Sequence, residues 1–276
     1  LTYFMNTKTI TLSPVKAIKQ GWAKVKQQLG LWTGISALVL TPNIIGGFFE
    51  PAEGEPYTLV VSLIVFIMSV VSALFSLGLI KAGLDANDKS EKVEFSDIWS
   101  VMDKRLISII GAYFLTFLIF IIPMVLIFSA IFGVVFFELP IAAAITLGII
   151  GFVAMVVVAI RLYFVQYAII DSSMTAVDAI RHSFAITKSY ELALIGFGLL
   201  IGLLNFLTIF TLFLGLLVTI PITTVASAYL YRMLSGQPII NITNSDDNSA
   251  ETNDDQFIDQ IDDEGISENT TDQENT

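Results

Sequence analysis

The fold is decided by residues 107–160, which read ISIIGAYFLTFLIFIIPMVLIFSAIFGVVFFELPIAAAITLGIIGFVAMVVVAI. Glu138 is the only charged residue in this stretch. About 20 consecutive apolar residues cross the roughly 30 Å hydrocarbon core of a bilayer as a helix. The stretch therefore predicts two transmembrane helices, 108–134 and 141–160, joined by a short turn at Glu138.

Similar apolar stretches occur on both sides of this pair. The chain has 276 residues, of which 55% are hydrophobic and only 14% are charged, whereas a soluble domain carries about 25% charged residues. We therefore expect an all-α fold, a polytopic membrane helical bundle with six transmembrane helices. The four further spans are predicted at 31–49, 57–80, 192–208 and 212–231.

The basic residues fall on one side of this predicted topology. Cytoplasmic loops of membrane proteins collect lysine and arginine. The opposite loops carry only the acids Glu50, Glu53, Glu55 and Glu138. The pattern predicts a multi-pass protein of the cell membrane with both termini in the cytoplasm. The 14 bases on the predicted inner side are Lys8, Lys16, Lys19, Lys24, Lys26, Lys81, Lys89, Lys92, Lys104, Arg105, Arg161, Arg181, Lys188 and Arg232.

Three parts are expected along the chain: a flexible N-terminus at 1–12, the membrane domain at 13–236, and an acidic tail at 237–276. From Asn241 onward the tail has 12 acidic residues and no basic one, which accounts for the net charge of −11. Such a composition predicts disorder. Its one apolar island, around Phe257, suggests docking to a protein partner; the alternative is a solvated tail without a partner.

A surface helix is predicted before the first span. Ser13 and Pro14 form a helix start, with a capping hydroxyl followed by proline at the first helical position. Ile18, Trp22 and Val25 then share one face. An amphipathic helix of this kind lies in the headgroup region of a bilayer. We expect it to contact anionic lipids, and the predicted contact residues are Lys16, Lys19, Trp22, Lys24 and Lys26.

A similar amphipathic segment, 177–188, precedes the fifth span and matches 15–26 at an offset of 162 residues. A third stretch, 95–102, precedes the third span and matches less well. The pattern suggests an internal repeat of one interfacial helix plus two spans. The alternative is that separate membrane-surface helices select the same basic, aromatic and small residues.

Few side chains suggest chemistry. Arg161 ends the fourth span and is expected either to anchor it at the inner interface or to pair structurally with Asp171. His182 is the only histidine, and its position beside Arg181 predicts a solvated or headgroup-facing side chain. Cysteine is absent, and no phosphate-binding or dinucleotide motif occurs. We therefore expect no catalytic, metal or cofactor site, and no nucleic-acid partner.

Residues of the membrane domain resemble a broad prokaryotic family of six-span membrane proteins of unknown function. That family is related to the membrane domain fused to some glycerophosphodiester phosphodiesterases. The resemblance implies the six-span fold and a membrane location, and it does not imply phosphodiesterase activity, because the chain has no soluble region large enough for the catalytic barrel. It rests on the segments 95–97, 179–188 and 229–232, and on Arg161, Asp171 and Pro221.

The first functional hypothesis is a non-enzymatic membrane protein that organises or senses the bilayer or a membrane partner. The alternative is a small transporter or lipid-handling protein, which would require a cavity at mid-membrane depth around Asn43, Asn205 or Thr224. An enzyme is the third hypothesis. It would require a pocket on the cytoplasmic side built from Asp97, Asp103, Asp171 and Asp178.

Overall fold

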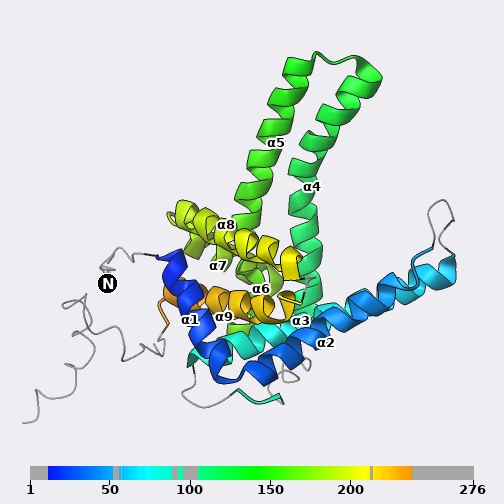
Figure 1. Cartoon of the computed structure of the whole chain (residues 1–276). Coiled ribbons are helices and arrows are strands. Elements are labelled where there is room, and N and C mark those ends of the chain that lie inside the picture. The colour runs from blue at the N-terminus through cyan, green and yellow to red at the C-terminus, as the bar shows by residue number, and fades with distance from the viewer. Residues whose placement is uncertain are drawn as a thin grey trace, which may run out of the picture. The chain divides into compact units, whose positions relative to one another are not determined.

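The computed structural model describes residues 12–51, 56, 58–88, 93–95, 105–211 and 214–237. These residues form an all-α bundle, as predicted. Its elements are α1 (Pro14–Gln27), α2 (Leu29–Gly47), α3 (Leu59–Asp88), α4 (Leu106–Phe137), α5 (Ile141–Leu162), α6 (Val165–Ser172), α7 (Ala176–Thr187), α8 (Glu191–Thr208), the 3-10 turn η2 (Ile209–Thr211) and α9 (Leu216–Ser235) (Figure 1).

Six helical segments in the described part of the chain are long and apolar enough to cross a bilayer. They agree with the six predicted spans. The largest differences are at the fourth span, which continues for twelve residues beyond the predicted end at Ile160, and at α3, which continues for eight residues beyond the predicted end at Ile80. Residues 82–87 of α3 are buried in the protein, and Lys81 and Asp85, spaced i,i+4 on the helix, form an ion pair.

The fourth span is made of α5 and α6, which together cover Ile141–Ser172. The helix breaks at Tyr163 and Phe164 and then resumes. The turn between α4 and α5 lies at Glu138, where the sequence predicted it. The six candidate spans therefore follow one another in the chain as three pairs, α2–α3, α4 with α5–α6, and α8–α9.

The two predicted surface helices are both present. Ser13 caps α1 by accepting a hydrogen bond from the Lys16 backbone N–H at 3.3 Å. Thr175 caps α7 in the same way, through the Asp178 N–H at 3.3 Å. A surface helix therefore precedes two spans at both ends of the domain. Most of the third predicted segment, 96–102, lies outside the described residues.

Helix α9 lies at the centre of the described bundle and contacts α1, α2, α3 and α8 (Figure 1). It is the most buried of the six spans. By contrast, α4 and α5 pair with each other and leave long apolar faces exposed, with Phe114, Phe117 and Phe136 uncovered by protein. An exposed apolar face of this extent suits contact with lipid.

Candidate functional site

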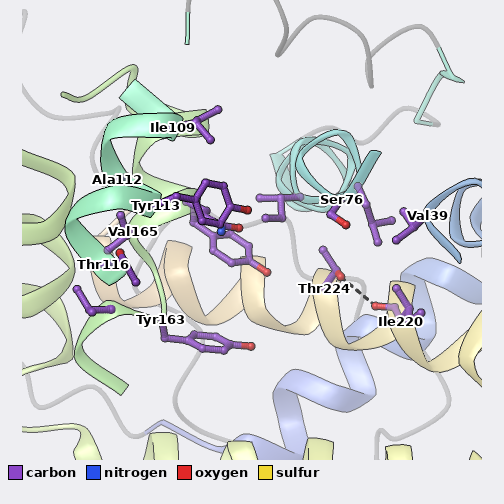
Figure 2. A pocket seen from close by; sticks show the side chains of 15 residues that line it. Val39, Ser76, Ile109, Ala112, Tyr113, Thr116, Tyr163, Val165, Ile220 and Thr224 are labelled. Carbon is purple, nitrogen blue, oxygen red and sulfur yellow. Dashed lines mark hydrogen bonds between the residues drawn. The ribbon is translucent and has the colours of Figure 1, made fainter. Parts of the chain in front are cut away.

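A cavity of about 350 Å³ lies between the α2–α3 hairpin and the α4–α5–α6 segment, with α9 along one side. Figure 2 shows Ser76 and Tyr113 on opposite sides of it, with Tyr163 and Thr224 along a third side. Its lining residues are Val39, Ser76, Leu79, Ile80, Ile109, Ala112, Tyr113, Thr116, Leu162, Tyr163, Val165, Gln166, Tyr167, Ile220 and Thr224.

None of the residues that line this cavity is charged. The lining is mostly apolar, and its polar groups are hydroxyls and one amide. Tyr163 exchanges a hydrogen bond of 2.7 Å with Ser227, and Thr224 donates to the Ile220 carbonyl at 2.9 Å. Ligand sites typically combine apolar walls with a few polar groups that orient the ligand.

The cavity occupies one of the three positions that the transporter hypothesis named. Thr224 lines it. Asn43 instead donates a hydrogen bond to Ser72 at 2.7 Å, which joins α2 to α3. Asn205 is exposed on α8. Of the three polar residues predicted to mark a cavity, only Thr224 therefore lines one.

Buried aromatic rings lie next to the cavity. Tyr167 lines it, and the Tyr167 ring lies 6.0 Å from the Tyr231 ring and 5.9 Å from the Phe164 ring, measured between centroids. Phe164 and Tyr231 are completely buried. These three rings, from the α5–α6 break, α6 and α9, form the aromatic layer.

Beyond the aromatic layer lies an ion-pair network centred on Arg232, which is buried with a residue exposure of 5%, whereas its partner Asp88 is partly exposed. Arg232 pairs with Asp171 at 2.7 Å and also with Asp88. Asp171 accepts further hydrogen bonds from the Tyr231 hydroxyl at 3.3 Å and the Gln237 amide at 3.0 Å. The Arg232 network therefore joins the C-terminal ends of α3, α6 and α9.

Local backbone geometry positions Gln237 for this contact. Gly236 adopts a left-handed conformation with φ of 69° and ends α9. The Gln237 N–H then donates to the Arg232 carbonyl at 3.0 Å. A glycine at this position ends a helix without the steric cost that a side chain would bring.

The structure corrects the predicted pairing of Arg161 with Asp171. Arg161 pairs with Glu191 at 2.5 Å, whereas Asp171 pairs with Arg232. The helix does break after Arg161, but α6 then carries Asp171 away by about 10 Å, at 1.5 Å per residue. No local spacing indicates these partners, because 30 residues separate Arg161 from Glu191 and 61 separate Asp171 from Arg232.

Ser183 on α7 connects the two sides of the break between α5 and α6. Its hydroxyl donates to the Arg161 carbonyl at 2.6 Å and accepts from the Phe164 N–H at 3.3 Å. These are backbone groups that a helix break leaves without their usual partners. The break that shapes one side of the cavity is therefore stabilised by a fully buried serine.

The structure also corrects the predicted lipid contacts of α1. Lys16, Lys19, Trp22 and Lys26 are exposed, but only 7% of Lys24 is accessible. Lys24 lies on the helix face that is buried in the bundle, the face that also carries Ala17, Gln20 and Gly21. Burial lowers the pKa of Lys24, and the nearby Asp88 carboxylate partly opposes that shift.

His182 is half-buried on α7, with its ring 6.2 Å from the Tyr231 ring. Burial lowers the pKa of His182, and the Asp171 carboxylate opposes this. His182 was predicted to be solvated or headgroup-facing; the structure leaves it partly exposed, with one side of the ring against the aromatic layer.

The acids that an enzyme would need are only partly described. Asp97 and Asp103 lie outside the described residues. Asp171 belongs to the Arg232 network, and Asp178 accepts a hydrogen bond from Thr175 at 2.7 Å at the start of α7. Within the described part of the chain, no group of three or more histidine, cysteine or acidic residues could hold a metal ion.

Comparisons with protein-family models, with curated proteins and with solved structures gave no match. The resemblance to the six-span family therefore stays a prediction. The proposed function rests on the geometry of the chain itself.

Proposed function

We propose that this integral membrane protein binds a small, uncharged amphipathic molecule from the bilayer in the cavity beside Thr224. This is the lipid-handling alternative predicted from the sequence, and it requires no catalytic step. The observation that carries it is a 350 Å³ cavity with apolar walls and several hydroxyl groups inside a six-span bundle. We also propose that both termini lie in the cytoplasm, because the lysine and arginine distribution supports that orientation.

The chemistry of the lining supports an uncharged ligand. A charged group entering an apolar cavity without an opposite charge would lose its hydration without compensation. Tyr113, Tyr163, Gln166 and Thr224 instead offer hydrogen bonds to a hydroxyl or carbonyl group. The volume is near the lower end of the range for ligand pockets, about 300–1,000 Å³. A medium-chain alcohol combines the apolar body and the single polar group that this lining favours.

The test is photocrosslinking in phosphatidylcholine vesicles with a diazirine-bearing medium-chain alcohol. The wild-type chain should be labelled in peptides from α3, α4 and α9. Thr224→Phe places a ring in the cavity and should reduce this labelling about tenfold, equivalent to about 1.4 kcal/mol of binding free energy.

Thr146→Phe is the matched control, because Thr146 is exposed on α5, away from the cavity. It should leave the labelling unchanged. A second probe, the corresponding fatty-acid carboxylate, should label the wild type more weakly than the alcohol. Equal labelling of wild type and Thr224→Phe, with both chains folded, would exclude the cavity as the binding site.

A second candidate function, organisation of anionic lipids at the inner surface, is favoured by α1. Lys16, Lys19, Trp22 and Lys26 are all exposed on this one helix. Basic side chains near an anionic surface each contribute about 1 kcal/mol of attraction. The two functions use different parts of the chain, and they can be tested separately.

A further inference from the structure

The three helices that converge on the Arg232 network also line the cavity. On α3, the cavity residue Ile80 precedes Asp88 by eight residues, or about 12 Å of helix. On α9, Thr224 precedes Arg232 by the same interval, and on α6 Tyr167 precedes Asp171 by about 6 Å. On each of the three helices, the network residue is therefore closer to the C-terminal end than the cavity residue is.

The space between the cavity and the network is filled by the aromatic layer. Tyr167 lines the cavity, and the buried Tyr231 ring beside it donates its hydroxyl hydrogen bond to Asp171. A molecule leaving in this direction would have to displace these rings and then separate Arg232 from two carboxylates. Separating them would leave the charges of the buried Arg232 and of Asp171 without partners, which is strongly unfavourable.

A different side of the cavity is less tightly closed. Its lining includes Ser76 and Ile80 from α3 and Tyr113 and Thr116 from α4. Figure 2 shows Ser76 and Tyr113 on opposite sides of the cavity. The helices α3 and α4 themselves make few direct contacts, because α6 packs between them toward the network. Beside the cavity, α4 carries exposed apolar side chains of the kind that contact lipid, namely Ile110, Phe114 and Phe117, whereas the exposed apolar side chains of α3 lie earlier in that helix, at 59–70.

We propose that the cavity exchanges its ligand sideways with the bilayer, between α3 and α4, and that the Arg232 network with the aromatic layer is a closed gate toward the predicted cytoplasmic end. The ligand would then be a molecule dissolved in the membrane. This route depends on the proposed binding function, but the accessibility of the cavity can be measured without any ligand.

The absence of cysteine makes this accessibility directly measurable, because a single introduced thiol has no background. Ser76→Cys places a thiol of similar size on the cavity wall. In vesicles, this thiol should react with an apolar maleimide that partitions into the bilayer. It should react at least tenfold more slowly with a negatively charged methanethiosulfonate supplied from both sides.

The gate is tested by adding Asp88→Asn, Asp171→Asn and Arg232→Gln to Ser76→Cys, which removes all three charges together. The charged reagent should then react at least tenfold faster. Asp171→Asn alone is the milder variant if the triple change prevents folding, because asparagine can still accept the Tyr231 and Gln237 hydrogen bonds. This single change should also increase the rate at which the charged reagent reacts with Ser76→Cys.

Ser69→Cys is the matched control on the same helix, since Ser69 is exposed on the outer part of α3. Its reaction with either reagent should not depend on the network charges. Equal rates for Ser76→Cys with and without the network charges would overturn the gate, whether both are fast or both are slow. If the alcohol probe still labels the cavity in that case, the proposed binding function stands and only the route is wrong.

Discussion

Arg232 is buried inside the bundle, and two carboxylates from other helices lie against its guanidinium group. A buried arginine without partners would carry a large desolvation cost, and pairing alone often only balances that cost. Asp88, Asp171 and the surrounding hydrogen bonds supply the compensation. Charged groups retained at such a cost commonly mark a functional or switching element in membrane proteins, and here they lie at the closed end of the cavity.

The single histidine, His182, makes the folding stability of the protein depend on pH. The ordinary histidine pKa is about 6.5, and burial lowers the pKa of His182 in the folded protein. Between these two values, the unfolded chain binds a proton that the folded chain does not. The contribution of His182 to folding stability is therefore present above about pH 6.5 and is lost as the pH falls below it.

The expected result is that detergent-solubilised wild type becomes less stable between neutral pH and about pH 5, and that His182→Asn shows a flatter dependence. Thermal unfolding followed by helicity would measure both slopes. Because His182 is the only histidine, few other groups titrate in this window. A variant slope as steep as the wild-type slope would show that another group causes the pH dependence.

The contact between α1 and α9 depends on Gly21. A Cβ atom at this position would lie only 2.4 Å from the Ile222 backbone carbonyl oxygen and 3.2 Å from the Ala226 side chain. The helices can approach this closely only because glycine lacks a side chain. In the predicted repeat, Gly21 corresponds to Ser183, the other small residue that lets a surface helix meet a backbone carbonyl.

We predict that Gly21→Ala destabilises the protein by about 1–3 kcal/mol, because α1 must move away from α9. The measurement is thermal unfolding of the purified chain in detergent. Gly34→Ala is the control within the neighbouring helix α2, where no atom lies within 4 Å of the added methyl group. It should be neutral or stabilising by up to about 1 kcal/mol. Equal effects at both positions would contradict the proposed close contact.

The helices could be predicted from the sequence where neighbouring residues alone determine them. The Ser13–Pro14 start of α1 and the six apolar spans depend on neighbouring residues and were confirmed. The end of α3 was placed too early, because residues 81–88 are polar enough to suggest a loop. Burial against α9 and the Lys81–Asp85 pair keep them helical.

At the scale of the whole molecule, the cavity and the Arg232 network could not be predicted from spacing. Both depend on the way helices distant in sequence meet, and α3, α6 and α9 contribute to each. The sequence did indicate Thr224, Arg161 and Asp171 as polar residues near membrane depth. It could not assign their partners, and it placed Lys24 on the lipid side because the position of α9 was unknown.

The distribution of charge over the whole chain leads to the last prediction. Exposed bases gather on α1, while 12 acids and no base occupy the tail from Asn241 onward. If α1 lies on an anionic inner surface, the changes Lys16→Gln, Lys19→Gln and Lys26→Gln should together reduce retained anionic lipid at least tenfold. This estimate follows from about 1 kcal/mol for each base near the surface. Native mass spectrometry of protein extracted with its own lipids would measure the retained lipid.

Lys24→Gln is the control that separates surface attraction from a general effect of α1. It removes the same charge from the same helix, but from a side chain buried in the bundle near Asp88. Because a buried lysine cannot approach lipid phosphates, this variant should retain lipid as the wild type does. A loss with Lys24→Gln equal to that of the triple variant would mean that lipid retention depends on the packing of α1. Exposed charge would then not explain the retention, and the cavity would remain as the argument for lipid handling.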